Sequence, residues 1–311
     1  MFWRNYGLAI RFAMMFGSLT VSTANAQTDG NHSIQNSLNV LLAAKNVSCD
    51  IRITIIVNGK EYSAKGHYAE QALPHVNPNF FLRSVYRLDI DFHIISSRTN
   101  NAEPNHEPNR MILVCYTADN GNVHQLDRYI SIEGNRSYTT VDLKRLEYRL
   151  RSASREHFFR QVSEVRNLGG LAGMMRQIHR FYEFSPPIQD NLQDERAIPA
   201  LKLTGTLRGI YRKELLTQFG GLNKQGHYPA DFPSDVEVWI GMHDGFPYQI
   251  RYLRRPSEKS SQQELLFQET FHNVVLNGPL LPDSRFAPLR LPEGIFSPED
   301  DTDNFIRSLG L

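Results

Sequence analysis

The chain has 311 residues and is almost neutral, with 34 Lys and Arg residues against 33 Asp and Glu residues. This balance argues against a general nucleic-acid-binding protein, which would carry an excess of basic residues. Apolar residues make up 41% of the chain, a fraction too high for a disordered protein. No apolar run reaches the roughly 18 residues of a membrane-spanning helix. We therefore expect a folded domain that does not bind nucleic acid.

The first 26 residues have the layout of a secretory signal peptide. Arg4 and Arg11 give a positive start, residues 12–21 are mostly apolar, and Ala24-Asn25-Ala26 is a small-x-small cleavage site. We predict that residues 1–26 are removed on export, which places the mature chain in the periplasm or outside the cell. The alternative is an uncleaved N-terminal anchor.

The two cysteines, Cys49 and Cys115, both lie in the predicted mature chain, residues 27–311. In an oxidising compartment such a pair can form a disulfide bond. The alternative is two buried thiols in neighbouring strands, because free cysteine is among the most buried residue types. No paired histidines lie near either cysteine, so a zinc site is not predicted.

The first half of the mature chain reads as a helix followed by a strand meander. A helix at 33–42 precedes residues 47–55, where apolar residues recur at every second position. Asn58-Gly59 predicts a hairpin turn. The clearest strand is Phe80–Ile94, with apolar residues on one face and Arg83, Arg87, Asp89, Asp91 and His93 on the other. Strands of this length suit a large curved sheet or barrel.

A helical block is predicted at about 142–184. One of its segments carries the helically spaced residues Leu171, Met174, Met175, Ile178 and Phe181. The segment 142–160 is basic, and we favour an amphipathic helix packed on the sheet with a solvated basic face. The alternative is peripheral contact with an anionic membrane surface.

The last third alternates again. Strands are expected at 201–207, 236–240, 246–253 and 263–275, with a helix at 211–219 and a short helical turn at 305–309. The order of elements predicts an α+β fold in one domain, 27–311, with a sheet curled around or covered by helices.

No nucleophile, metal-binding or phosphate-loop motif is found, so we predict a protein that is not an enzyme and holds no cofactor. Asp89, Asp91 and His93 are the only compact acid–base candidates, and a solvated polar sheet face explains them better. The acidic cluster 299–303 resembles half a calcium loop but lacks its glycine, and carboxylates at a helix start explain it better.

The apolar sheet face and the methionine-bearing helix face have two interpretations. They form a plain core, or they leave space between them that accepts acyl chains, because methionine pairs adapt to irregular contents. The candidate ligand-lining residues are Leu82, Leu88, Ile90, Phe92, Met174, Met175 and Ile178.

The layout of the chain also resembles a known group of proteins. The segments that carry the likeness are Asn58-Gly59, Gly66-His67-Tyr68, Val141-Asp142-Leu143, Phe232–Arg255 and Pro292-Glu293-Gly294 followed by Asp301-Thr302-Asp303. In these segments the chain is similar to LolA-like periplasmic lipoprotein carriers and RseB-type regulators, and most similar to larger uncharacterised secreted bacterial members.

This resemblance implies an incomplete antiparallel β-barrel covered by helices, whose apolar interior takes lipid chains. It implies a binder or carrier in the bacterial envelope, with a lipid or an acylated protein as partner. The alternative is an RseB-like sensor that binds an envelope protein, in which the apolar face is plain core.

Overall fold

The computed structural model describes residues 29–57, 60–73, 84–94, 109–118, 123–132, 135–152, 170–192, 197–218, 220–257, 260–289 and 297–308. The predicted signal peptide and Leu82 lie outside these residues. Within them, no helix has both the length and the apolar character that crossing a bilayer requires.

A single sheet of 13 strands organises the described residues. Its strands are β1 (Asn46–Val57), β2 (Lys60–Ala72), β3 (Ser84–Ile94), β4 (Asn109–Ala118), β5 (Val123–Ile132), β6 (Asn135–Asp142), β7 (Tyr182–Phe184), β8 (Ile188–Leu192), β9 (Ile198–Leu207), β10 (Asp235–Gly241), β11 (Pro247–Arg254), β12 (Glu264–Leu276) and β13 (Glu299–Asp300). Their spatial order is β13-β6-β5-β4-β3-β2-β1-β12-β11-β10-β9-β7, and β8 also pairs with β9.

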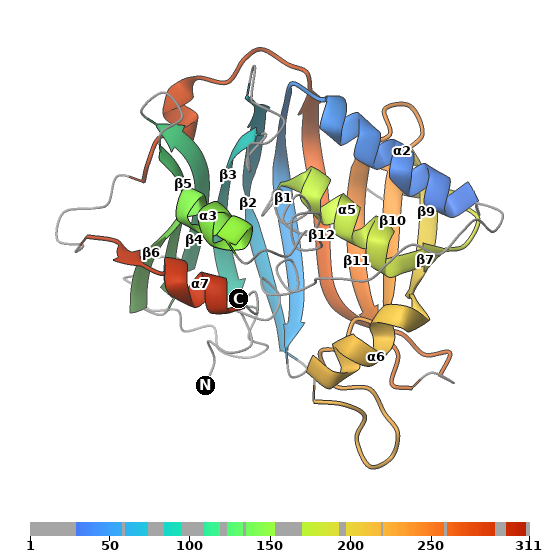
Figure 1. Ribbon diagram of the computed structural model, residues 1–311. Helices are drawn as coiled ribbons and strands as arrows, with labels where there is room; N and C mark the ends of the chain where they lie inside the picture. The colour runs from blue at the N-terminus through green and yellow to red at the C-terminus, as the bar shows by residue number, and fades with distance from the viewer. Residues whose placement is uncertain are drawn as a thin grey trace, which may run out of the picture.

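Two meanders meet in the middle of this sheet. The first runs from β1 to β6, the second from β9 to β12, and β12 pairs antiparallel with β1, so that Ile51 lies opposite Phe271. The described pairs are antiparallel apart from β13 beside β6. The strands at the two ends of the sheet are not paired with each other in the described residues. The sheet is therefore curved but unclosed, which confirms the predicted incomplete antiparallel barrel (Figure 1).

The strands β2 and β3 approach each other closely at Gly66, which pairs with Ile90. A Cβ atom at Gly66 would lie 1.9 Å from the carbonyl oxygen of Asp89, so no side chain fits there without a shift of the backbone. Glycine is the residue that permits such close backbone contact within a strand.

Helices cover one face of the sheet in Figure 1. The helices of the described residues are α2 (Asp29–Ala43), α3 (Leu143–Ser152), α5 (Leu171–Phe181), α6 (Gly209–Gln218) and α7 (Thr302–Ser308), with a 3₁₀ turn, η2 (Asp283–Phe286). The helices α2 and α5 pack together in front of β1 and β9–β12, whereas α3 and α7 pack on β5 and β6. We call the helix-covered side of the sheet the concave face.

The main core lies between this concave face and the helices. Alternate residues of the strands enter it, as the sequence predicted for Val47, Cys49, Ile51, Ile53 and Ile55. A smaller cluster on the outer face contains Ile112, Val114, Tyr116 and Tyr129, and Leu289 of the C-terminal segment packs on it. Apolar alternation therefore marks the concave face over both meanders.

The predicted helical block is partly corrected by the structure. Helices α3 and α5 lie within it, but residues 182–184 form β7, and the polar segment beyond it contains β8. Both strands pair with β9, whose edge would otherwise present unpaired backbone groups. Residues 153–169, which include most of the other predicted helical segment, lie outside the described residues. The first helix begins at Asp29, about one turn earlier than expected.

Candidate functional site

The concave face brings most of the predicted lining residues together. Leu88, Ile90 and Phe92 project from β3, and Met174, Met175 and Ile178 project from α5; all six belong to one continuous apolar cluster. A strand and a helix that are about 80 residues apart in the sequence thus contribute to the same interior.

The six residues differ in how deeply they are buried. Ile90 and Met175 are 0% exposed and Ile178 is 1% exposed, whereas Leu88, Phe92 and Met174 are only partly buried against the cluster. Other partly buried members on the same face include Leu113 and Ile130. The first group packs as core. The second group keeps apolar surface accessible, as a ligand-contacting face requires.

Glu269 is an acid on this apolar face that sequence reasoning missed. Ile53 of β1 and Ile250 of β11 lie opposite it in the strand register, and Phe267 and Phe271 share its side of β12. The residue is 8% exposed, and no described residue donates a hydrogen bond to its carboxylate or pairs with it. Burial raises the pKa of Glu269 to about 7.

A signal for Glu269 was present in the sequence. In the alternating strand predicted at 263–275, it occupies the same parity as Phe267 and Phe271, so a strict period of two places it on the apolar face. An acid at an apolar position of a strand is an exception that marks a candidate functional residue.

A second acid on the concave face, Glu70 of β2, is held by hydrogen bonds. The Tyr68 hydroxyl donates to one carboxylate oxygen at 2.6 Å, and the Ser84 hydroxyl donates to the other at 2.7 Å. The backbone N–H of Leu171, at the start of α5, donates to the Tyr68 hydroxyl at 3.2 Å. This chain of hydrogen bonds fastens the first turn of α5 to β2, and it satisfies one of the free N–H groups of a helix start.

The two cysteines are free and buried. Cys49 lies on β1 and Cys115 on β4, with β2 and β3 between them. Three strand spacings of about 4.8 Å place them roughly 14 Å apart, beyond the reach of a disulfide bond. The structure therefore favours the buried-thiol alternative over the bridge, although the two strands are not neighbours. Burial is the main reason why the pKa of each thiol is raised.

The acid–base candidates Asp89 and Asp91 lie on the outer face of β3, away from the main core. Arg110 donates to Asp89 at 2.9 and 3.0 Å, and Arg87 approaches it at 3.3 Å. A cavity of about 230 Å³ next to them is lined by His67, Arg87, Asp89 and Arg285. The side chain of His93 lies outside the described residues. Asp89 is thus paired with arginines on the outer face. This arrangement fits the polar sheet face that the sequence analysis favoured over an acid–base site.

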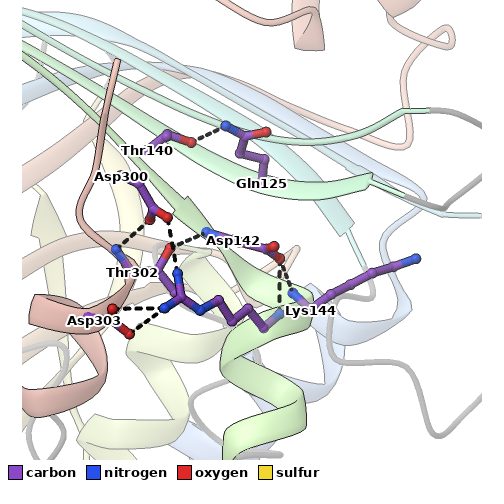
Figure 2. Close-up of polar contacts among 8 residues, drawn as sticks. Gln125, Thr140, Asp142, Lys144, Asp300, Thr302 and Asp303 are labelled. Atoms are coloured by element: carbon purple, nitrogen blue, oxygen red, sulfur yellow. Dashed lines mark hydrogen bonds and ion pairs between the residues drawn. The ribbon is translucent and has the colours of Figure 1, made fainter. Parts of the chain in front are cut away.

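The acidic cluster before α7 is also explained by ion pairs, as Figure 2 shows. Arg145 of α3 donates to Asp300 at 3.1 Å and to Asp303 at 2.8 Å. The Thr302 hydroxyl accepts from the backbone N–H of Asp142 at 2.9 Å, and Asp142 in turn caps the start of α3. Within the described residues, no three His, Cys, Asp or Glu side chains are arranged to hold a metal ion. These carboxylates join α3 to α7.

Comparison with known proteins finds similarity at the level of structure. The chain matches no protein-family model, and no curated protein matches it in sequence. LprF from Mycobacterium bovis shares 11% identity over 81% of this chain and 95% of that chain, with a TM-score of 0.36. Lipoprotein LppX from Mycobacterium tuberculosis shares 11% identity over 81% of this chain and 97% of that chain, with a TM-score of 0.31.

A third similar structure is the MucA/MucB complex of Pseudomonas aeruginosa, with 12% identity over 84% of this chain and 62% of that chain, and a TM-score of 0.37. The similar structures thus include the mycobacterial lipoprotein LppX and a complex of MucB with MucA. At these identities and TM-scores the likeness concerns the general layout of sheet and helices.

Proposed function

We propose that this chain is an exported binding protein that holds an acyl ligand between the concave face of its sheet and the covering helices. The observation that carries the proposal is the set of partly buried apolar side chains on that face, Leu88, Phe92 and Met174 among them. Covering such residues with methylene groups contributes about 0.8 kcal/mol per methylene before ordering costs.

The first test is a lipid analysis of the mature protein purified from an envelope fraction. Gentle extraction and mass spectrometry should find an acyl species at a constant ratio to protein. In parallel, the lipid-free protein should take up a fluorescent fatty acid. A protein that contains no lipid and takes up none would contradict the proposal and favour the alternative, an envelope module that binds a protein partner.

Variants test the location of the ligand. Phe92→Ser and Met174→Ser remove partly buried apolar side chains and should weaken uptake of the fluorescent fatty acid by about tenfold or more. Ile210→Ser on α6 is the matched control, because Ile210 is 71% exposed and lies outside the concave cluster. Equal uptake by all three variants would place the ligand elsewhere.

A further inference from the structure

A purely apolar ligand would give the Glu269 carboxyl no hydrogen-bond partner. An acyl chain offers no hydrogen bond, yet this carboxyl lies in an apolar surrounding at 8% exposure. A buried polar group without a partner opposes folding, and an ionised one does so more strongly. Among the described residues, no arginine or histidine offsets the charge of an ionised Glu269, because burial alone accounts for the shift of its pKa.

The row of residues that crosses the sheet at Glu269 connects it to the predicted lining residues. Through successive strand registers, Glu269 lies beside Ile53, Ile53 beside Ala64, and Ala64 beside Phe92. Glu269 and Phe92 are therefore in one row on the concave face, roughly 14 Å apart across three strand spacings. Only a small and a medium-sized apolar side chain separate them. A lipid whose chain covers Phe92 can thus place its polar end near Glu269.

The groups around Glu269 determine which kind of lipid head group fits beside it. Glu269 interacts electrostatically with two ionisable groups, the Cys49 thiol on β1 and the Tyr252 hydroxyl on β11. Burial raises the pKa of both, so both stay uncharged at neutral pH. Because no described residue supplies a counter-ion, the uncharged carboxylic acid is the favoured form, and its O–H is a hydrogen-bond donor. Its natural complement is an acceptor without charge.

We propose that the ligand is an ester- or amide-linked lipid, and that the protonated Glu269 carboxyl donates a hydrogen bond to its carbonyl oxygen. This inference rests on the proposed function and adds the class of ligand that the interior selects. A ligand that covers the face also removes the remaining water around Glu269, which favours the protonated form further. An alkylamine would require the ionised form instead, and its binding would depend on pH in the opposite direction.

Two matched lipids separate these possibilities. Dipalmitoylglycerol carries two ester carbonyls, and its diether analogue dihexadecylglycerol has the same chain length and none. Each competes with a fluorescent fatty acid for the purified full-length mature protein. At about pH 6 the wild-type protein should prefer the diester about three- to tenfold, the range of one hydrogen bond. The preference should fade by about pH 8.5, as Glu269 ionises.

Two substitutions assign the effect to Glu269. Glu269→Gln keeps an uncharged donor and should retain the preference at both pH values, whereas Glu269→Leu should lose it. His179 on α5 is also titratable, and burial together with the charge of Arg208 lowers its pKa. Loss of the pH dependence in Glu269→Gln therefore excludes His179 as its source. Glu264→Gln, an exposed acid on the same strand, is the control and should behave as wild type.

The outcomes distinguish this inference from the proposed function. If both lipids bind equally well to the wild-type protein, the carbonyl contact is wrong and the binding function stands. If hexadecylamine binds more tightly as the pH rises, the ionised Glu269 binds its ammonium group, which also overturns the inference. If neither lipid displaces the probe and the probe itself is not taken up, the proposed function fails. Circular dichroism of each variant excludes loss of fold as the cause.

Discussion

Two glutamates that the structure describes on the concave face have contrasting surroundings. Glu70, on β2, accepts hydrogen bonds from Tyr68 and Ser84, and through Tyr68 it is joined to the start of α5. Glu269, on β12, lies among Ile53, Ile250 and Phe271 without a hydrogen-bond donor among the described residues. The same residue type on the same face is therefore part of a structural link at one place and has no partner among the described residues at the other.

This difference separates a residue that serves the fold from a residue that opposes it. The hydrogen bonds of Glu70 offset the cost of removing its carboxylate from water. For Glu269 nothing described offsets that cost, and a ligand is the group that can do so.

The largest expected effect concerns the pH dependence of stability. Burial raises the pKa of Glu269 from 4.5 to about 7. The folded protein thus binds the proton more tightly than the unfolded chain, and stability falls as the pH rises from about 4.5 to about 7, by about 3 kcal/mol. Below this window the contribution is constant, and above it the full penalty of the buried charge remains. Denaturant unfolding at several pH values measures the slope.

The variant Glu269→Leu should remove that slope and be more stable than wild type by about 2–3 kcal/mol at about pH 8. Near about pH 4 the two proteins should differ much less. Glu264→Leu, on the exposed part of the same strand, should keep the wild-type slope. A wild-type slope that survives in Glu269→Leu would show that another group titrates in this window.

Glu70→Ala should lower the stability of the protein, in contrast to Glu269→Leu, which should raise it. It removes the acceptor of two hydroxyl groups, Tyr68 and Ser84, and leaves a buried Tyr68 hydroxyl with one partner fewer. We expect a loss of about 2 kcal/mol in the free energy of unfolding. Glu61→Ala, at an exposed position of the same strand, should change it by less than about 0.5 kcal/mol. Equal effects of the two substitutions would mean that the hydrogen bonds of Glu70 do not stabilise the fold.

The fold was largely predictable because alternation is a strong signal when one face of a sheet is buried. Val47 to Ile55 and Val236 to Ile240 entered the main core with the predicted parity. Strand β7 was missed because it has only three residues, and β8 was missed because most of its side chains are exposed. What makes them strands is the free edge of β9, a feature of tertiary structure that their own sequence does not contain.

The candidate site was predictable in part for the same reason. Periodicity located the residues of β3 and α5 on facing surfaces, since apolar stripes must pack against each other. It did not reveal that β1 pairs with β12, because the two strands lie more than 200 residues apart in the sequence. Without that pairing, Glu269 could not be placed in one row with Phe92. Whether an acid is unpaired is decided by neighbours that only the structure identifies.

A smaller effect is expected from Tyr68→Phe, which breaks the link between Glu70 and α5 but keeps the aromatic ring. It should cost about 1–2 kcal/mol, because one neutral hydrogen bond to the Leu171 N–H and one to a carboxylate are lost. Hydrogen exchange should become faster at the first turn of α5, while the amides of β12 around Glu269 keep their protection. Faster exchange in both places would show that the two regions are not independent.

The smallest effect concerns the two cysteines. Burial is the largest cause of the raised pKa of both thiols; Glu269 is the largest electrostatic cause for Cys49, and Asp127 followed by Glu70 acts on Cys115. Both should therefore resist alkylation in the folded protein at about pH 8, and Glu269→Leu should change the rate at Cys49 by about twofold or less. Mass spectrometry of protein purified without reductant should count two free thiols. A protein lighter by two hydrogens would contain the disulfide bond, and because β2 and β3 separate the two cysteines, that result would contradict the strand order on which the placement of Glu269 depends.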